Sequence, residues 1–393
     1  MLLECVPNFS EGRDVSIINK IAAAIESVQH VKILHTDIGF AANRTVITFA
    51  GEADAVIEAA FRAIKIASEL VDMTKHTGVH PRIGATDVCP LIPLSGISMA
   101  QTVELSVKLA RRVGNELNIP VYLYENSASL PHRKNLADIR KDEYEGLQQK
   151  MLQPEWQPDF FGGQGSPVDN NFLTSNQNNT PLTLNAGATV IGARDFLIAY
   201  NVNLDTQDVS IAKEIAKDVR ESGRKRGEER LERRNENLSV NSNLISHNSS
   251  FMSKSLSLKS VKAIGWYIPE YQRAQVSMNL TNINITSVHT AFEACKKSAQ
   301  KYGVRVTGSE LIGLIPEKVL LEAGKFYFDV GRRTFDSGKE PDLVFNTQSQ
   351  TFLIEVAVKH LGLDELKPFY PNERIIEYVL EKKFSSGVLR QLF

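Results

Sequence analysis

The amino-acid sequence predicts an α/β protein of two subdomains, each with the element order β-α-β-β-α-β. Short apolar runs rich in β-branched residues alternate with longer segments of helical period, and this order occurs once in each half of the chain. The 393 residues suggest two or three domains and are ample for a buried core. Because helices that separate the strands would cover one face of each sheet, we expect the two bare faces to pack together.

The first half of the chain contains five predicted strands and three predicted helices. The strands are apolar runs with high β propensity, at residues 2–6, 31–35, 43–50, 86–93 and 119–124. The helices carry apolar side chains three and four residues apart, at residues 15–28, 54–71 and 99–116. In the second helix Ile57 and Ile64 belong to such a stripe, which predicts a face buried against the sheet.

The second half repeats this order of elements without a repeat of residues. The same criteria predict strands at residues 196–204, 261–268, 275–282 and 304–311, and helices at residues 207–221 and 287–301. We therefore expect an N-terminal subdomain at residues 1–185 and a C-terminal subdomain at residues 186–393.

Two stretches interrupt the pattern. Residues 162–187 are rich in Gly, Asn and Thr, and a loop of this length is usually functional or disordered. Residues 222–260 begin with mixed charges and continue into a segment in which residues 235–260 include nine Ser and five Asn. That composition predicts a solvated, mobile insertion in the C-terminal subdomain.

Charge and composition argue against several classes of protein. The 45 basic and 46 acidic side chains give a net charge of -1, without the basic excess of a nucleic-acid-binding protein. No apolar stretch approaches the roughly 18 residues of a membrane span, and the N-terminal residues resemble neither a signal nor a transit peptide. Cys5, Cys89 and Cys295 form no CxxC pair, which favours a reducing compartment. We expect a soluble, cytoplasmic protein.

The densest polar segment is DMTKHTGVHPRIGATDVCP at residues 72–90. Its glycines permit tight turns and its proline at position 81 ends helices, so it is predicted to be a loop between a helix and a strand. Catalytic side chains concentrate in loops of this kind. His80, between Val79 and Pro81, is the candidate proton carrier because imidazole titrates near neutral pH.

The same segment offers a weaker metal hypothesis. His76 and His80 have the four-residue spacing of a zinc pair on a helix. However, Gly78 and Pro81 oppose a continuous helix, and neither a HExxH glutamate nor a third ligand is evident. We expect no metal site.

A second polar cluster precedes the predicted strand at residues 43–50. It contains Asp37, Gly39 and Arg44. The residues alone favour a turn aspartate that satisfies backbone donors over a catalytic one. The segment GATVIGAR at residues 187–194 has the composition of a phosphate loop, but it lacks the lysine and the glycine order of the known motifs.

Eight short motifs are spread over most of the chain. They are ECVPNFSEG at 4–12, TDIG at 36–39, NRTV at 43–46, HPRIGATDVCPLIP at 80–93, PVYLYE at 120–125, GARDFLIAYNVNL at 192–204, IGWY at 264–267 and PNERIIEYVL at 371–380. In sequence and order these motifs resemble the formiminotransferase domain of glutamate formimidoyltransferases. The resemblance implies two formiminotransferase subdomains around a folate-binding groove, and a homodimer.

The resemblance also implies a reaction and its residues. The formimino group of N-formimino-L-glutamate would pass to tetrahydrofolate, a co-substrate, in histidine degradation. The family's catalytic histidine and aspartate fall on His80 and Asp37. Its folate-contacting stretch is interrupted here by a polar insertion, so only its ends carry over, namely Gly162, Gly163 and Gly187.

Arginines are the natural partners of the two glutamate carboxylates, because a guanidinium binds a carboxylate through two parallel hydrogen bonds. Arg44, Arg82 and Arg194 are the candidates by their places in the motifs. The sequence does not rank them.

Three alternatives stay open at this point. The first is a related one-carbon transferase that uses N-formylglutamate or acts on 5-formyltetrahydrofolate. The second is a folate-binding protein without catalysis, against which the presence of both His80 and Asp37 argues. The third is a scaffold that uses its Ser- and Asn-rich segment as a tether for a partner. In every case except the last the expected partners are small molecules, not nucleic acids or membranes.

Overall fold

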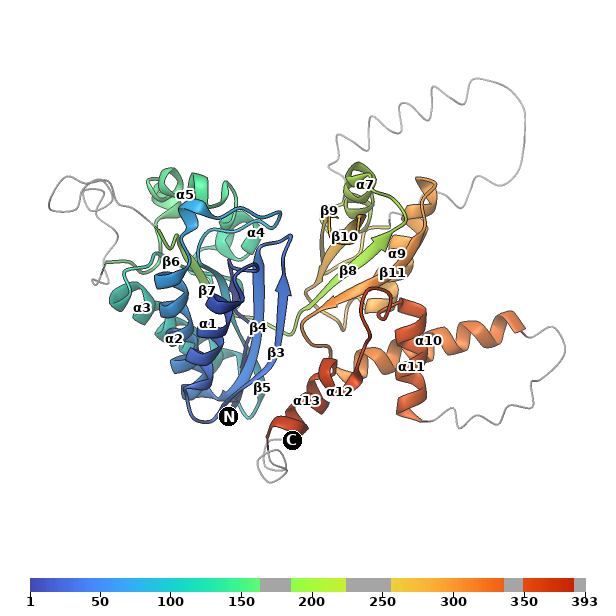
Figure 1. The fold of residues 1–393 in the computed structure, drawn as a ribbon, viewed down its shortest axis with the longest axis horizontal. Helices are drawn as coiled ribbons and strands as arrows, with labels where there is room; N and C mark the ends of the chain where they lie inside the picture. Colours follow the sequence, from blue (N-terminus) through green and yellow to red (C-terminus); the bar gives the residue numbers. More distant parts are fainter. Residues whose placement is uncertain (163–184, 224–255, 336–348, 385–393) are drawn as a thin grey trace, which may run out of the picture. The chain divides into compact units, whose positions relative to one another are not determined.

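The computed structural model describes residues 1–162, 185–223, 256–335 and 349–384. They fall into two compact units, of which unit 1 comprises Met1–Asp195 with Asn372–Phe393 and unit 2 comprises Phe196–Pro371 (Figure 1). The division lies after residue 195, and not at 185 as expected, because a strand at Thr189–Ala193 pairs with strands of unit 1. Most of the expected mobile insertion, residues 224–255, lies outside the described residues.

Unit 1 contains one mixed sheet. Its strands within the described residues are β1 (Leu2–Cys5), β2 (Asn8–Phe9), β3 (Val31–Gly39), β4 (Arg44–Glu52), β5 (Thr86–Ser95), β6 (Val121–Leu123) and β7 (Thr189–Ala193). Because β1 and β2 each pair with both β4 and β5, the spatial order is β3, β4, β1 with β2, β5, β7, β6. Pro7 lies in the break between β1 and β2, where a residue without an N–H cannot continue the ladder. The pairings of β7 with β5 and β6 are parallel.

Unit 2 contains a four-stranded antiparallel sheet within the part of the chain that is described. Its strands are β8 (Ile198–Leu204), β9 (Val261–Ile268), β10 (Arg273–Leu280) and β11 (Val306–Ile312), in the order β11, β8, β10, β9. In both units the strands lie side by side in the order fourth, first, third and second, counted along the chain. In unit 1 these four strands are β5, β1, β4 and β3. The predicted α/β fold with two β-α-β-β-α-β subdomains is therefore confirmed.

The helices lie between these strands along the chain and at the end of each unit. Those of unit 1 are α1 (Val15–Glu26), α2 (Ala53–Leu70), α3 (Met99–Glu116), α4 (Leu136–Ile139), α5 (Glu143–Met151) and α13 (Ile376–Lys383). Those of unit 2 are α7 (Val209–Val219), α9 (Val288–Lys301), α10 (Glu317–Phe335) and α11 (Gln350–Leu361). The short α12 (Pro371–Arg374) lies where the chain returns from unit 2 to unit 1. Single 3₁₀ turns occur at η1 (Met73–Lys75), η2 (Glu125–Ser127), η3 (Pro131–Arg133) and η4 (Pro154–Trp156).

Local signals explain where these helices begin. The Asp14 side chain accepts a hydrogen bond from the amide of Ser16, and this caps the first turn of α1. Helix α3 begins with a capping box, in which Ser98 and Gln101 satisfy each other's backbone amides. These caps lie directly before the predicted helices, so the starts of both are confirmed.

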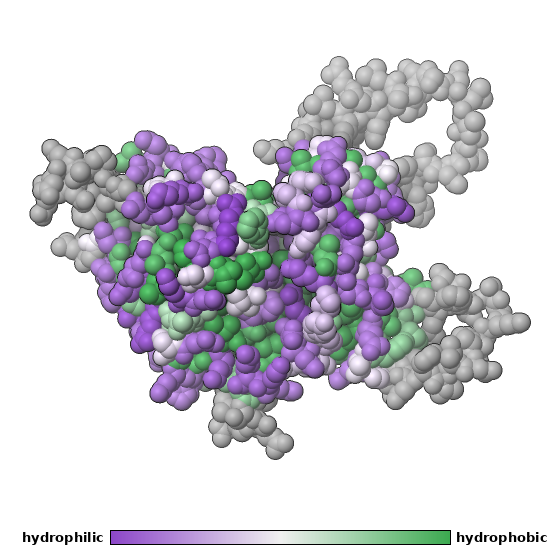
Figure 2. Space-filling model, viewed as in Figure 1, coloured by the Kyte–Doolittle hydropathy of each residue, from purple (hydrophilic) through white to green (hydrophobic). Residues whose placement is uncertain are grey.

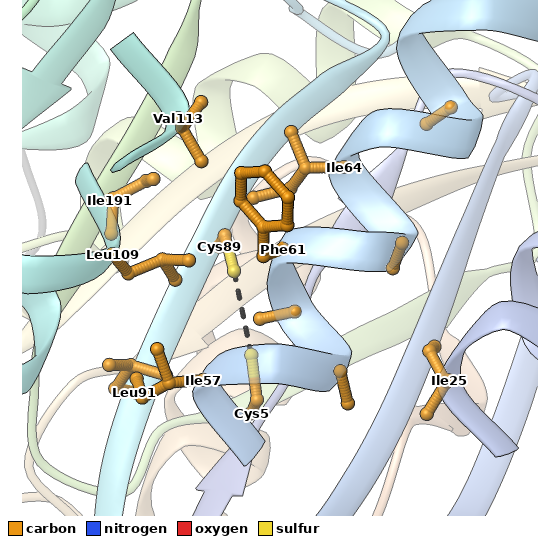
Figure 3. Packing of buried hydrophobic residues seen from close by; sticks show 14 of the residues in the cluster. Cys5, Ile25, Ile57, Phe61, Ile64, Cys89, Leu91, Leu109, Val113 and Ile191 are labelled. Atoms are coloured by element: carbon orange, nitrogen blue, oxygen red, sulfur yellow. Dashed lines mark hydrogen bonds between the residues drawn. The ribbon is translucent and has the colours of Figure 1, made fainter. Parts of the chain in front are cut away.

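The main core of unit 1 lies between α1, α2, α3 and one face of the sheet. Figure 3 shows Ile57, Phe61 and Ile64 of α2 directed toward the strands, as the helical stripe predicts. Cys5 of β1 and Cys89 of β5 lie beneath them with their sulfur atoms 3.5 Å apart. Both thiols are free, and burial raises the pKa of the Cys5 thiol, so the pair packs as small apolar groups.

Strand alternation places polar residues on the opposite face of this sheet. Ile47 and Phe49 of β4 belong to the helix-covered core, so Arg44 points to the other face. Asp37 shares that face because it lies opposite Val46 in the β3–β4 register. Glu4 reaches it too, since its neighbours Leu3 and Cys5 are in the core. We call this surface the polar face of unit 1.

The face of the molecule seen in Figure 2 is mainly hydrophilic. Figure 2 shows polar and charged side chains over most of the visible surface of each unit, and apolar patches lie among these polar side chains. Among the helices that the structure describes, none combines the length and apolar composition of a membrane span.

Candidate functional site

The loop that carries His80 is clamped to the segment before β7. The amide of Ala85 donates to the carbonyl of Ala186 at 2.8 Å, and the amide of Ala188 donates to the carbonyl of Ile83 at 2.9 Å. Gly84 and Gly187 form an isolated bridge between the two segments. The loop is therefore held in place by a segment about a hundred residues later in the sequence. This attachment restricts the positions of the side chains that the loop carries.

Glycine is required on both sides of this clamp. A Cβ atom added to Gly84 would lie 2.1 Å from the carbonyl oxygen of Ala188. At Gly187, where φ is +68°, it would lie 2.2 Å from the carbonyl oxygen of Ile83. Backbone oxygens cannot move aside as a flexible side chain can, so both positions exclude larger residues.

Gly187→Ala is therefore expected to destabilise unit 1 through two effects. The left-handed backbone costs an L-residue about 1–2 kcal/mol, and overpacking adds about 1–3 kcal/mol. Gly303→Ala is the matched control, because Gly303 has the same φ of +68° with nothing within 4 Å of the added Cβ. Denaturant unfolding of both variants measures the difference, and equal losses would contradict the proposed clamp.

The hydrogen bonds of His80 fix its protonation state. Nε2 lies 2.5 Å from an Arg44 guanidinium nitrogen, and Nδ1 lies 2.7 Å from the carbonyl oxygen of Pro81. A guanidinium only donates, so Nε2 accepts from Arg44 and Nδ1–H donates to Pro81. Burial, together with the charges of Arg44 and Arg140, holds the pKa of His80 well below its usual value. The ring is neutral near pH 7, with its basic nitrogen directed at Arg44.

One further arginine, Arg140, and a buried aspartate, Asp87, extend this site. Arg140 follows α4 and pairs with both carboxylate oxygens of Asp87, which also accepts from the amide of Ile83 at 3.1 Å. Asp87 thereby holds Arg140 close enough to act on both His80 and Arg44. Burial and the neighbouring Arg140 lower the pKa of Arg44 to about 10. The cationic Arg44 thus lies directly beside a neutral imidazole, while Asp87 pairs with Arg140. A guanidinium in this position suits an anionic ligand.

Asp37 lies near this cluster. Its carboxylate is 3.8 Å from Nε2 of His35, and that nitrogen is 3.1 Å from a guanidinium nitrogen of Arg374. The charge of Asp37 also acts on Arg44 and favours its cationic form. Arg44 therefore interacts with Asp37 through charge and with His80 through a hydrogen bond. The catalytic role of Asp37 stays a prediction.

The guanidinium of Arg82 is directed toward other protein groups. It donates to Glu143 at 2.7 Å and to both carboxylate oxygens of Glu145 at 2.8 and 2.6 Å. It also donates to Nδ1 and to the carbonyl oxygen of His76, both at 3.1 Å. These contacts engage all three of its nitrogen atoms. Its predicted role in substrate binding therefore has less geometric support than that of Arg44.

Arg194 follows β7 and lies at another part of the polar face. One guanidinium nitrogen donates to the carbonyl oxygen of Asp195 at 2.9 Å, and the side chain acts on Tyr124 and on Glu4. Tyr124 is in turn within electrostatic reach of Arg140. Tyr124 therefore links the Arg194 region to the His80 region.

The three glycines carried over from the folate-contacting stretch differ in what the structure shows of them. Gly187 belongs to the clamp described above. Gly162 has a φ of +77°, and Gly163 lies outside the described residues. Within the described parts of the chain, no three His, Cys, Asp or Glu side chains gather as a metal ligand set.

Two family models match the chain. The formiminotransferase domain, N-terminal subdomain, matches residues 2–194, and the formiminotransferase domain matches residues 199–381. The chain belongs to the formiminotransferase family. Both matches fall within the limits of the two structural units apart from the C-terminal return to unit 1.

Characterised relatives of this formiminotransferase-family chain are of two lengths. Formimidoyltransferase-cyclodeaminase of Mus musculus is 41% identical over 96% of this chain, which spans 60% of the length of that relative. Glutamate formimidoyltransferases of Streptococcus pyogenes serotype M1 and Thermoplasma acidophilum are 38% and 39% identical over 86% of this chain, and the matches cover 96% and 95% of those proteins.

Sequence reasoning assigned no role to three residues in and around this candidate site. Arg140 lies in a segment without motif or periodicity, and Glu4 was read only as part of a predicted strand. Asp87 lies in the polar segment at residues 72–90 and was given no role. Strand alternation holds the signal for Glu4, because a charged residue between Leu3 and Cys5 marks a strand with one polar face. No local pattern marks Arg140.

Proposed function

We propose that this protein transfers the formimino group of N-formimino-L-glutamate to tetrahydrofolate, producing 5-formiminotetrahydrofolate and L-glutamate. The observation that carries this proposal is the neutral His80, whose basic nitrogen lies against the guanidinium of Arg44. The names of the relatives from Streptococcus pyogenes and Thermoplasma acidophilum, both glutamate formimidoyltransferases, support the same reaction.

The reaction needs one proton carrier that acts twice. The N5 amine of the pterin attacks the amidine carbon, the new C–N bond forms, and the amine proton passes to Nε2 of His80. The imidazolium then gives this proton to the glutamate nitrogen, the bond from that nitrogen to carbon breaks, and glutamate leaves as an amine. His80 returns to its neutral form, so the proton balance closes.

Arg44 must release Nε2 before His80 can accept a proton. A substrate carboxylate that pairs with the Arg44 guanidinium would draw its N–H groups away from the imidazole. The same anion offsets the positive charge that lowers the pKa of His80, so substrate binding would also make the ring a stronger base. In this proposal the second carboxylate pairs with Arg194. Asp37 would stabilise the cationic amidine or imidazolium of the intermediate.

A product assay with two donors tests the proposed function. Purified protein is incubated with tetrahydrofolate and either N-formiminoglutamate or N-formylglutamate, and acid converts the 5-formimino product to its methenyl form for absorbance measurement. Product from formiminoglutamate is the expected result. Product from formylglutamate alone would move the protein to the related transferase reaction, and intact folate binding with neither product would indicate a non-catalytic folate-binding protein.

We also propose that the reaction serves histidine degradation and that the protein acts in the cytoplasm as a homodimer. The free thiols of Cys5, Cys89 and Cys295 support a reducing compartment. Cyclic dimers are the commonest assemblies of soluble enzymes. Sedimentation equilibrium of the purified full chain measures the mass of the assembly, and a monomer at assay concentration would contradict the dimer.

A further inference from the structure

Glu4 is a buried carboxyl that the proposed mechanism does not use. It lies on the polar face of β1 and is 2% exposed. Its Oε2 atom has no hydrogen-bond partner among the described residues. The residues opposite it are Ala50 on β4 and Ile92 on β5, neither of which carries a charge. A carboxylate in such surroundings is costly unless a cation compensates it.

Arg194 is the nearby cation, because its amide donates to the carbonyl of Leu91 at 3.0 Å, one residue before the Ile92 that lies opposite Glu4. It is the charged group that acts on Glu4, and it favours the ionised carboxylate, whereas burial opposes ionisation more strongly. The other titratable groups nearby are the Cys5 thiol on the same strand, the Cys89 thiol beside it, and the Tyr124 hydroxyl beside Arg194. Burial raises the pKa of the Cys5 thiol and of the Tyr124 hydroxyl, so both are neutral near pH 7. The pKa of Glu4 is raised to about 7, within the range of the assay.

We propose that Glu4 is a specificity-determining residue that competes with the substrate carboxylate for Arg194, so that binding of the anionic donor is coupled to protonation of Glu4. This inference rests on the proposed function, in which Arg194 binds a carboxylate. When Glu4 is protonated, the charge of Arg194 is available to the donor. When Glu4 is ionised, its charge offsets part of that of Arg194 and repels a second carboxylate.

The coupling has a defined sign. A carboxylate bound at Arg194 makes ionisation of Glu4 less favourable, and by reciprocity an ionised Glu4 weakens binding of that carboxylate. Above pH 7 each pH unit lowers the protonated fraction of Glu4 about tenfold. In the limit of full competition, KM for N-formiminoglutamate therefore rises by up to about tenfold per pH unit above pH 7.

The kinetic test compares three proteins between pH 6 and pH 9. Wild type is expected to show the rise in KM for N-formiminoglutamate, Glu4→Gln to show a flat KM over this range, and Glu69→Gln on the exposed side of α2 to follow wild type. The pH profile of kcat should be the same in all three, which a merely structural effect of the substitution would not produce. An unchanged KM slope in Glu4→Gln overturns the proposal.

A second measurement titrates Glu4 without reference to activity. Because the folded pKa lies above that of the unfolded chain, wild type loses stability relative to Glu4→Gln as pH rises from about 4.5 to 7, and the difference stays constant above pH 7. The melting temperatures of both proteins over this range measure it. If the difference in melting temperature between the two proteins did not change over this pH range, the competition between Glu4 and the donor would be overturned, and the proposed function would stand. Absence of product, and of L-glutamate binding by calorimetry, at every pH would overturn the proposed function and the competition with it.

Discussion

His80→Ala is expected to lower kcat for formimino transfer by roughly 10²- to 10⁴-fold, the usual contribution of a general acid–base group. Binding of tetrahydrofolate should change little, because the variant removes the proton carrier and leaves the clamp around the loop in place. Steady-state kinetics and equilibrium folate binding on the same preparation separate the two effects. Comparable losses in both would indicate that His80 has a structural role.

His76→Ala is the matched control for this variant. His76 lies on the same loop, where its Nε2 is 2.9 Å from the carbonyl oxygen of Asn43 and its Nδ1 accepts from Arg82. It therefore holds the loop together, and its loss should lower stability more than kcat. If the two variants lost equal activity, the proton-carrying role would not be specific to His80.

The lowered pKa of His80 also predicts an acid limb for stability. The unfolded chain takes up a proton near the ordinary pKa of 6.5, whereas folded His80 does so only at lower pH. The contribution of this group is therefore complete above pH 6.5 and is lost as pH falls through that value toward the folded pKa. This part of the acid sensitivity should be absent from His80→Ala.

Arg82→Met is expected to lower the free energy of unfolding by about 3 kcal/mol, close to the lower end of the range for breaking a buried ion pair. The Arg82 side chain is 8% exposed, and its removal leaves a carbonyl oxygen and Nδ1 of His76 without their donor. The carboxylates of Glu143 and Glu145 are more exposed, and water compensates part of their loss. KM for the glutamate donor should change little. Denaturant unfolding and donor kinetics measure the two quantities.

Arg62→Met provides the comparison for Arg82→Met. Arg62 pairs with Glu58 one turn away on the exposed side of α2, and such pairs contribute about 0.3–0.5 kcal/mol. A small stability loss for Arg82→Met accompanied by a large rise in KM would instead support the substrate-binding role that its place in the HPR motif implies.

Local sequence pattern was sufficient to predict the elements that form each β-α-β-β-α-β unit. Helices α1, α2 and α3 and their strands depend on apolar spacing and on caps such as Asp14 and Ser98, which neighbouring residues specify. The motif around His80 was equally readable, because Gly78, Pro81 and Gly84 mark a loop in any tertiary context.

Other elements were not predictable in this way. Strand β2 has only two residues. The segment of β7 was noted for the composition of a phosphate loop, without the known motifs, and was not predicted to be a strand. The strands β5 and β6 supply its hydrogen-bond partners, so its identity depends on residues distant in the sequence. Helices α4, α5, α10, α11 and α13 also fell outside the expected elements.

The chemistry of the polar face depends most on tertiary structure. Residue types and motifs pointed to His80, Asp37 and Arg44, but only the fold brings Arg44 of β4 against the ring of a loop residue and Arg140 against Asp87. The fold also pairs Arg82 with Glu143 and Glu145. It buries Glu4 within the electrostatic influence of Arg194. Secondary structure follows from interactions within a few residues, whereas charge and protonation follow from burial and from neighbours far along the chain, which only the folded arrangement determines.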